Sequence, residues 1–327
     1  MSKLVSIIIP TYNRANFLPL TLNSFVSQDY PFDSYEIIVS DNNSTDRTKE
    51  VVEQYIGNTP VSVRYIFEQR QGVHYARNSA AMLAQGEILY FTDDDMIAEP
   101  DLLKSLIPVF SLDPLIGVAT GRILPRFEIQ APEWVERCLT NAYLSLTDKD
   151  RPEQLVVSLN DTMVYSCHQA IRRDVFFKAG GFNPENTAGV WIGDGETGLN
   201  IKIKALGYRF AYTTTSIIHH IIPEERMRLS YLVKRIGNQG FCDSYTEYRS
   251  HRQKSRIIPL LLSRSTIGAF KLLAITFGMI MLGKESWHFI PARLAYLYKR
   301  NVYDLKLYLN EGFRKQAEID DWLNIGK

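Results

Sequence analysis

The first third of the chain alternates two kinds of apolar pattern. Short, continuous, β-branched runs are typical of strands buried on both faces, whereas apolar residues spaced three or four positions apart are typical of helices. The predicted strands are Leu4–Pro10, Tyr35–Ser40, Val61–Phe67 and Ile88–Thr92. The helices predicted between them are Phe17–Gln28, Asp46–Ile56 and His74–Ala84. This alternation predicts an α/β fold with a mostly parallel sheet flanked by helices.

The pattern loosens after about residue 115 and then becomes helical. We expect a helix over Glu196–Leu206 that Gly207 terminates, followed by a β-like run over Phe210–Ile218. The sequence therefore divides into residues 1–115, residues 116–225 and a helical region over residues 226–327.

Two features of the helical region concern membranes. The longest uncharged apolar run, Leu272–Gly283, has 12 residues, fewer than the roughly 20 that span a bilayer. After Pro291 an amphipathic helix is predicted, with Lys and Arg off its apolar face. The residues of that face are Leu294, Leu297, Tyr298, Leu305 and Leu309. This helix either packs on the rest of the protein or lies in the headgroup layer of a membrane.

Charge is unevenly distributed along the chain. The formal net charge is +1, but residues 228–315 carry 16 Lys and Arg against 5 Asp and Glu. Such a segment suits an anionic partner, and we expect peripheral contact with an anionic membrane rather than nucleic acid, for which no recognisable module is present.

Cysteine usage and the N-terminal pattern bear on the compartment. Cys138, Cys167 and Cys242 are odd in number and widely spaced, which predicts neither a disulfide framework nor a zinc site. The apolar run Val5–Ile9 is too short for a signal peptide. We therefore expect a cytoplasmic protein, docked at the inner face of a membrane if the amphipathic helix binds lipid.

Three adjacent carboxylates, Asp93, Asp94 and Asp95, follow directly after a predicted buried strand. Because like charges repel, a cation is the simplest reason to keep them together. Oxygen ligands suit Mg²⁺ or Mn²⁺, which commonly accompany phosphates. The alternative is a solvated acidic turn.

Other polar residues also follow predicted strands, where ligands bind in open α/β sheets. The loop at the end of the first strand contains Pro10, Thr11, Tyr12, Asn13 and Arg14, and the second strand is followed by Asp41. Asp41 either accepts a hydrogen bond from a nucleotide base or caps the next helix. No glycine-rich fingerprint or P-loop follows the first strand, which disfavours dinucleotide oxidoreductases and P-loop enzymes.

In this order, these motifs resemble those of the family-2 inverting glycosyltransferases, which use nucleotide sugars. The resemblance covers residues 4–240 or so. The matching segments are Val5–Arg14, Asp41–Asp46, Gly72–Asn78, Gly86–Glu87, Asp93–Asp95, Arg172–Phe176, Gly180–Phe182 and Gly193–Glu196.

The resemblance implies a GT-A, Rossmann-like fold with a mixed, mostly parallel sheet. Residues 1–115 would bind the nucleotide sugar and residues 116–225 would supply the acceptor site and the catalytic base. Asp95 would bind Mn²⁺ or Mg²⁺, with Asp93 on the ribose or the metal. The donor-binding residues would be Pro10, Thr11, Tyr12, Asn13, Arg14, Asp41, Arg77, Asp93 and Asp94. Arg77 would face the phosphates, unless it forms only a surface salt bridge.

The catalytic base has two candidates. Inversion requires a carboxylate that removes the proton of the acceptor hydroxyl. The Glu-Asp pair of the family is altered here to Asp194-Gly195-Glu196. Counting back from Leu199 and Lys202 places Glu196 in the base position, with Asp194 as the rival.

The resemblance also implies roles for residues further along the chain. His219, in the pair His219-His220, would reach the metal or phosphates, although a structural role is the alternative. Arg226, Arg228 and Arg235 would lie near the diphosphate. His168 and Gln169 would line the sugar pocket, and Trp191 either stacks on an acceptor sugar or packs in the core.

The predicted activity is transfer of a sugar from a nucleoside diphosphate to a hydroxyl of a glycan or lipid-linked acceptor. The alternatives are a catalytically silent sugar-binding or scaffolding protein, which the altered acidic pair motivates, and a sugar-phosphate nucleotidyltransferase. The latter needs a glycine-rich basic loop after the first strand, which the chain lacks.

Overall fold

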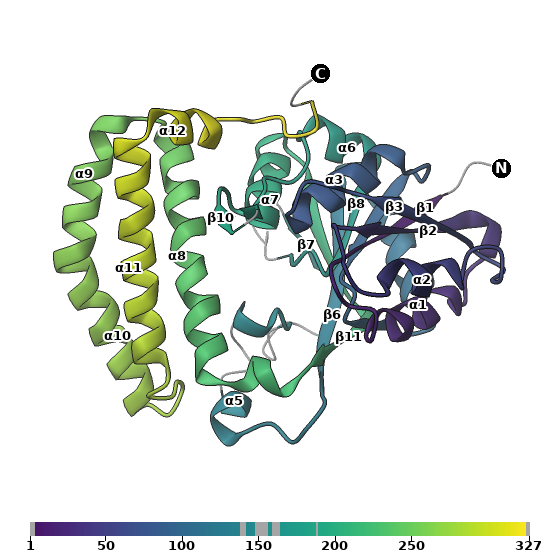
Figure 1. Ribbon diagram of the computed structural model, residues 1–327, viewed down its shortest axis with the longest axis horizontal. Coiled ribbons are helices and arrows are strands. Elements are labelled where there is room, and N and C mark those ends of the chain that lie inside the picture. Colours follow the sequence, from purple (N-terminus) through teal and green to yellow (C-terminus); the bar gives the residue numbers. More distant parts are fainter. Residues whose placement is uncertain (1–3, 138–141, 148–155, 159–163, 188, 325–327) are drawn as a thin grey trace.

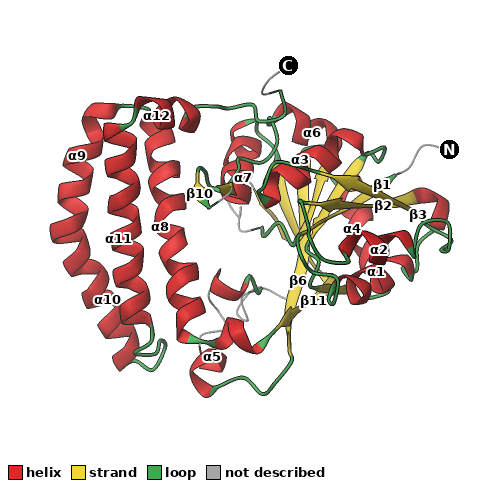
Figure 2. Cartoon of the chain, in the orientation of Figure 1, coloured by secondary structure: helices red, strands yellow, loops and turns green. Residues whose placement is uncertain are grey.

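The computed structural model describes residues 4–137, 142–147, 156–158, 164–187 and 189–324. One twisted mixed sheet forms its centre, with helices on both faces and a separate layer of long helices to one side (Figures 1 and 2). The strands follow the spatial order β3-β2-β1-β4-β8-β6-β11-β5, with β7 paired to β11. The strand bounds are β1 Val5–Thr11, β2 Tyr35–Asp41, β3 Ser62–Phe67, β4 Ile88–Thr92, β5 Met96–Ala98, β6 Ile116–Phe127, β7 Val156–Ser158, β8 His168–Arg172 and β11 Arg209–Ile222, with a small hairpin of β9 Asn186–Thr187 and β10 Val190–Trp191.

The N-terminal half confirms the predicted alternation. Strand β1 pairs in parallel with β2 and β4, and β2 pairs in parallel with β3. Every residue of β1, β2 and β4 is buried, as their continuous apolar composition predicts. The helices of this half and of the middle of the chain are α1 Leu18–Val26, α2 Thr48–Glu53, α3 Val73–Leu83, α4 Leu102–Leu106, α5 Glu133–Arg137, α6 Arg173–Lys178 and α7 Gly195–Ala205. Short 3-10 turns cover Phe32–Ser34, Ile107–Ser111, Ala142–Leu144 and Glu224–Met227.

Helix α2 is shorter than the predicted Asp46–Ile56. Asp46 lies outside the helix because its side chain accepts hydrogen bonds from the backbone N–H and the hydroxyl of Thr48. Gly57, with φ of +74°, follows the last turn. The apolar spacing therefore predicts the helix, but local hydrogen bonds at one end and a glycine beyond the other make it shorter than predicted.

The sheet continues across the boundary at residue 115. Strand β8 lies antiparallel between β4 and β6, and β11 pairs with β6 on one side and β5 on the other. Since β5 begins directly after the acidic triplet, its pairing with β11 sets Met96 opposite His220. A strand from the second half of the chain thus reaches the acids at the end of β4.

The C-terminal region forms a layer of long helices beside the sheet (Figure 1). Its helices are α8 Leu229–His251, α9 Lys254–Ser263, α10 Ala269–Met281, α11 Phe289–Leu309 and α12 Glu311–Ala317. A π-helical turn, Arg264–Gly268, joins α9 and α10. Together they form one helix over Lys254–Met281, with 28 residues and a mean hydropathy of 1.5 over its most apolar window, long and apolar enough to cross a membrane.

This corrects the sequence estimate, which counted only the uncharged run Leu272–Gly283. Arg264 and Lys271 interrupt the apolar run but do not interrupt the helix. The chain then returns to the body of the protein, where the backbone N–H of Trp322 donates to the carbonyl of Gly180, just after α6, at 3.0 Å. The functional division at residues 115 and 225 remains a proposal.

Candidate functional site

A cleft of about 950 Å³ opens at the carboxyl ends of β1 and β4, and residues of α3, α7 and α8 complete its walls. Most of the residues predicted for donor binding or chemistry line it: Pro10, Thr11, Tyr12, Arg14, Arg77, Asp93, Asp94, Asp95, Glu196, Arg226 and Arg235. It is also lined by Asn42, Asn43, Gln71, Gly72, Val73, His74, Ser145, Tyr165, Ser166, Cys167, Glu185, Asn186 and Gly189.

Asp95 lies at the junction of the two halves of the chain. Its Oδ2 pairs with Arg226 Nη2 at 2.6 Å and with Arg14 Nη2 at 3.8 Å. Its Oδ1 lies 3.8 Å from His220 Nε2. Burial alone would raise the pKa of Asp95, but the charges of Arg226 and Arg14 bring that pKa below its ordinary value. Asp95 is therefore an ionised carboxylate inside the protein.

The structure corrects the choice between the two histidines. His220 faces Asp95, whereas His219 points to the other side of β11 and bonds to Glu99 through Nε2 at 2.7 Å. Side chains alternate along a strand, so only one of two adjacent residues can face the cleft. Neither histidine is among the residues that line the cleft, but His220 lies beside Asp95, which does line it.

The remaining acids of the triplet point in different directions. Asp93 forms an ion pair with Arg77, so Arg77 has a partner inside the cleft rather than on the surface. Asp94 accepts a 2.7 Å hydrogen bond from the Thr11 hydroxyl, and its backbone carbonyl accepts one from Thr21. Burial and the neighbouring charge of Asp95 raise the pKa of Asp94 to about 7. Asp94 therefore ties β1 to β4, while Asp93 and Asp95 each pair with an arginine.

Asp93, Asp95 and His220 carry the kinds of donor atom that a divalent cation takes, but in this structure each contacts an arginine: Asp93 pairs with Arg77, and Asp95 and His220 both contact Arg226. The Nδ1 of His220 lies 2.8 Å from the carbonyl of Leu144, which can only accept, so Nδ1 donates and Nε2 keeps its lone pair. That lone pair accepts a short contact from Arg226 Nη1. Two carboxylates and a neutral imidazole are a donor set that suits Mn²⁺ or Mg²⁺.

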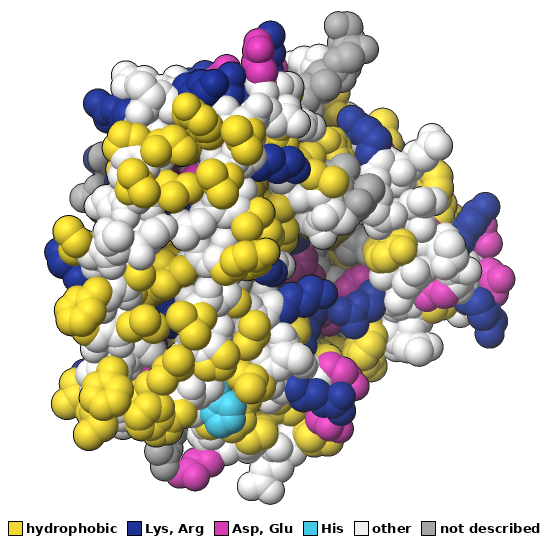
Figure 3. Space-filling view, turned by 60° about the vertical axis from the view of Figure 1, so that its left-hand side comes forward, with side chains coloured by type: hydrophobic (Ala, Val, Ile, Leu, Met, Phe, Trp, Pro, Cys, Tyr) yellow, Lys and Arg dark blue, Asp and Glu magenta, His cyan; other side chains and the backbone are white. Residues whose placement is uncertain are grey.

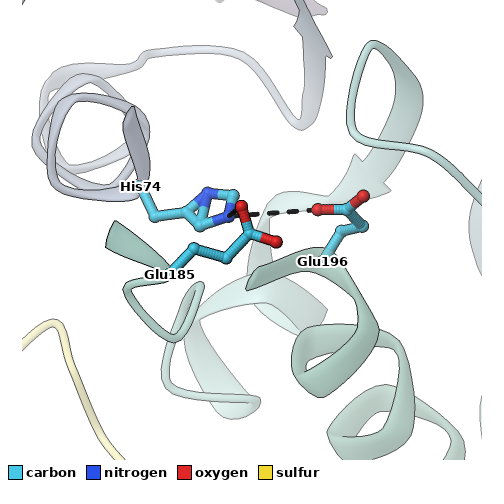
Figure 4. Close-up of side chains that lie close together, drawn as sticks. All are labelled: His74, Glu185 and Glu196. Atoms are coloured by element: carbon cyan, nitrogen blue, oxygen red, sulfur yellow. Dashed lines mark ion pairs between the residues drawn. The ribbon is translucent and has the colours of Figure 1, made fainter. Parts of the chain in front are cut away.

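His74, Glu185 and Glu196 form a second cluster, in which the histidine offers a proton instead of a lone pair (Figure 4). His74 is buried, its ring stacks on Phe182 at 5.0 Å, and its Nε2 lies 3.9 Å from a carboxylate oxygen of each glutamate. Its Nδ1 lies 3.1 Å from Arg77 Nη1.

Because a guanidinium can only donate, Nδ1 of His74 must accept, and the ring proton resides on Nε2. Burial and the charge of Arg77 hold the pKa of His74 well below its ordinary value, so the ring is neutral. An Nε2–H group cannot ligate a metal. It is instead a buried donor that has no hydrogen-bond partner among the described residues and is directed at two carboxylates.

The spacing of this cluster leaves room for one oxygen atom. At 3.9 Å, Nε2 is too far from Glu185 or Glu196 to bond directly, yet an oxygen could lie about 2.8 Å from both partners. The cluster therefore suits a water molecule or a hydroxyl, with His74 donating and a carboxylate accepting.

Glu185 and Glu196 differ in their surroundings. Burial and the charge of Glu196 raise the pKa of Glu185 to about 7, although Arg235 and Arg77 oppose the shift. The backbone carbonyl of Glu185 accepts a hydrogen bond from Ile192 N at 2.7 Å, which fixes the base of the β9–β10 hairpin beside α7.

Asp194 lies outside the cleft lining, beneath α7. Its carboxylate accepts hydrogen bonds from Asn183 Nδ2 at 2.8 Å and from the Thr246 hydroxyl at 2.7 Å. A Cβ at Gly198 would come within 2.0 Å of Asp194 Oδ1, so glycine is required there. Asp194 is therefore engaged in holding the start of α7, whereas Glu196 faces the cleft.

The three residues predicted to bind the acceptor do not line the cleft. His168 is fully buried and lies 2.8 Å from the Tyr90 hydroxyl through Nδ1. Gln169 is fully buried and donates to Asn200 at 2.7 Å. Trp191 stacks on Phe241 at 5.6 Å, as in the core-packing alternative. The structure therefore places all three side chains away from the cleft: His168 and Gln169 lie in β8, an internal strand of the sheet, and Trp191 lies in the β9–β10 hairpin.

Two predicted donor-binding residues support the cleft from behind. Asp41 accepts hydrogen bonds from Ser44 N and the Tyr65 hydroxyl, both at 2.8 Å, so it stabilises the turn after β2. Asn13, at φ +52°, bonds to Thr45 N at 2.7 Å. The adjacent Asn42 and Asn43 line the cleft instead. Arg228, also predicted near the diphosphate, is exposed and pairs with Glu224.

Comparison with known proteins shows the family of the chain. The family model described as glycosyl transferase family 2 matches residues 6–179. Validoxylamine A glucosyltransferase of Streptomyces hygroscopicus subsp. jinggangensis is 38% identical over 106 residues, which are 32% of this chain and 25% of that protein. Glucosyl-dolichyl phosphate glucuronosyltransferase of Haloferax volcanii is 24% identical over 250 residues, 72% of this chain and 75% of that protein. The chain spans about a quarter to a third of the length of the first curated relatives that it matches.

Solved structures share the fold. The mannosyltransferase PcManGT from Pyrobaculum calidifontis, in complex with GDP-Man and Mn²⁺, superposes with a TM-score of 0.61 at 20% identity, covering 93% of this chain and 88% of that one. Staphylococcus aureus TarS in complex with UDP-GlcNAc superposes with a TM-score of 0.54 at 17% identity, covering 93% and 91%. The predicted GT-A fold is confirmed.

The raised pKa of Glu185 predicts a pH-dependent stability difference. An ordinary glutamate pKa is 4.5, so between about pH 4.5 and pH 7 the unfolded chain loses this proton while the folded protein keeps it. Rising pH therefore destabilises the wild type, but not Glu185→Gln. We expect the variant to be equally stable at about pH 4.5 and more stable, by up to about 3 kcal/mol, above pH 7.

Denaturant unfolding across this pH range measures the difference. Glu87→Gln, at an exposed carboxylate, is the matched control. A Glu185→Gln difference that stays constant with pH would contradict the analysis.

Proposed function

The chain belongs to glycosyl transferase family 2, and on that premise we propose that it transfers a sugar, with inversion, from a nucleoside diphosphate to an acceptor hydroxyl. The observation that carries this proposal is the convergence of Asp95, His220 and Arg226 at the end of β4, opposite Glu196 in the same cleft. One wall is suited to a diphosphate and the other to a hydroxyl.

The diphosphate would lie against the first wall. Arg14 and Arg226 each pair with Asp95, and Arg77 pairs with Asp93, so the wall carries guanidinium and carboxylate groups together. A divalent cation held by Asp93, Asp95 and His220 would neutralise charge on the departing nucleoside diphosphate. The guanidinium groups then remain available to bind phosphate oxygens.

Glu196 would act as the catalytic base. The acceptor oxygen would attack the anomeric carbon, the bond from that carbon to the diphosphate would break, and the hydroxyl proton would pass to Glu196. His74 supports this role because its Nε2–H can hold the acceptor oxygen within reach of Glu196. Glu185, with a pKa of about 7, would accept or retain a proton beside the base.

We propose a glycan or a lipid-linked acceptor. The Haloferax relative is named for a dolichyl phosphate substrate, and TarS for a poly(ribitol-phosphate) one. Asp41 does not specify the base of the donor, because both of its carboxylate oxygens already have partners.

Nucleotide binding is expected to depend on a divalent metal and on Asp95. UDP and GDP, tested separately with and without Mn²⁺, should raise the melting temperature for one base, with the larger rise in Mn²⁺. Asp95→Asn should abolish the metal-dependent part of this rise in melting temperature, because the substitution removes a negative charge from the metal ligands. The exposed Asp29→Asn is the control. Equal shifts in both proteins would contradict the proposed metal site.

Turnover distinguishes the two candidate bases. Hydrolysis of the nucleotide sugar that gives the shift, with water as acceptor, should fall by about 10²-fold or more in Glu196→Gln, while nucleotide binding persists. Asp194→Asn should lose thermal stability but keep most of its turnover per folded molecule, because Asp194 faces Asn183 and Thr246. Loss of turnover in Asp194→Asn alone would assign the base to Asp194.

A further inference from the structure

Two stripes of exposed apolar side chains run along the outer helices of the C-terminal layer. On the π-turn and α10, Ile267, Phe270, Phe277 and Met281 recur at helical spacing. Phe270 is 76% exposed and Met281 67%. On α11 the corresponding residues are Leu294, Tyr298, Val302, Leu305 and Leu309, all exposed. We call these two stripes together the outer apolar face.

The outer apolar face is larger than the scattered apolar exposure of ordinary protein surfaces. Figure 3 shows many hydrophobic side chains on the helical layer, interspersed with uncharged polar side chains and backbone, while Lys, Arg, Asp and Glu lie beside the neighbouring hollow and along the edges of the view. Contiguous apolar patches of this kind mark an interaction with another protein or with a membrane.

The charges around the face select between these partners. Between residues 248 and 310 the chain has 11 Lys and Arg and only two acids, Glu285 and Asp304. Each acid pairs with an arginine of the same region, Arg293 and Arg264 respectively. Exposed basic side chains accompany the apolar stripes: Lys254, Arg256, Lys271 and Lys284.

We propose that the outer apolar face docks on a lipid bilayer containing anionic phospholipids, with α10 and α11 lying in the headgroup layer. Apolar side chains would enter the acyl boundary, and the lysines would contact lipid phosphates. A second copy of this chain fits less well, because it would oppose one basic surface with another.

The helix over Lys254–Met281 is held to the body of the protein rather than free to cross the bilayer. Arg264, at its centre, pairs with Glu247 of α8 and with Asp304 of α11. Asp304 is buried, so withdrawing Arg264 would leave a buried carboxylate without its cation. Thr276 and Ile280 are buried on the same side.

The same helical layer contributes to the cleft. Arg235 of α8 lines the cleft, while α10 and α11 carry the outer apolar face. Docking would therefore hold the cleft close to the bilayer surface, where a lipid-linked acceptor is accessible. The docking proposal itself does not depend on the proposed function.

Vesicle flotation tests the proposal with the full chain. The wild type is expected to float with vesicles of phosphatidylglycerol and phosphatidylcholine, and less with phosphatidylcholine alone or at high salt. The double variant Phe270→Asp, Phe277→Asp should bind at least about tenfold more weakly. The matched control is Ile56→Asp, Leu112→Asp, which alters exposed apolar residues of the nucleotide half.

Both variants should keep the wild-type melting temperature and nucleotide binding, which separates lost docking from lost folding or function. Three results would overturn the proposal: no flotation of the wild type, equal flotation of the phenylalanine variant, or a stable dimer that the phenylalanine substitutions dissociate. Retention in membranes after alkaline carbonate extraction would also overturn it, because that result indicates a spanning helix.

Discussion

The site depends on how the protein compensates the negative charge that it gathers at the end of β4. A carboxylate buried as deeply as Asp95 is costly unless cations lie beside it. Arg226 supplies the cation and the neutral His220 faces the same carboxylate, and both residues come from the second half of the chain. The pairing of β5 with β11 brings them there, so the topology of the sheet supplies the groups that stabilise the buried carboxylate of Asp95.

Two histidines, His74 in the cleft and His220 beside Asp95, have opposite roles because their neighbours fix opposite tautomers. His220 donates through Nδ1 to a carbonyl and keeps a lone pair for a cation. His74 accepts at Nδ1 from Arg77 and offers a proton at Nε2. Residue type alone would assign both to metal binding, whereas the hydrogen-bond partners separate a cation site from a hydroxyl site.

The sequence predicts the parallel half of the fold and the acidic triplet, because local apolar patterns and strand ends determine them. Its spacing from Leu199 also singles out Glu196, which lines the cleft. It misses Glu185, since only the hairpin between β9 and β10 brings this residue to α7. It misplaces His168 and Gln169 because no local pattern shows that β8 lies inside the sheet. Long-range pairing, not local propensity, decides these positions.

The central claim is that the strand-end carboxylates hold a divalent cation together with His220. Anomalous scattering from crystals grown with Mn²⁺ and the nucleotide that the protein binds tests it most directly. We expect a manganese peak between Asp95 and His220, in contact with the diphosphate. A peak among His74, Glu185 and Glu196, or no peak beside Asp95, would contradict the account.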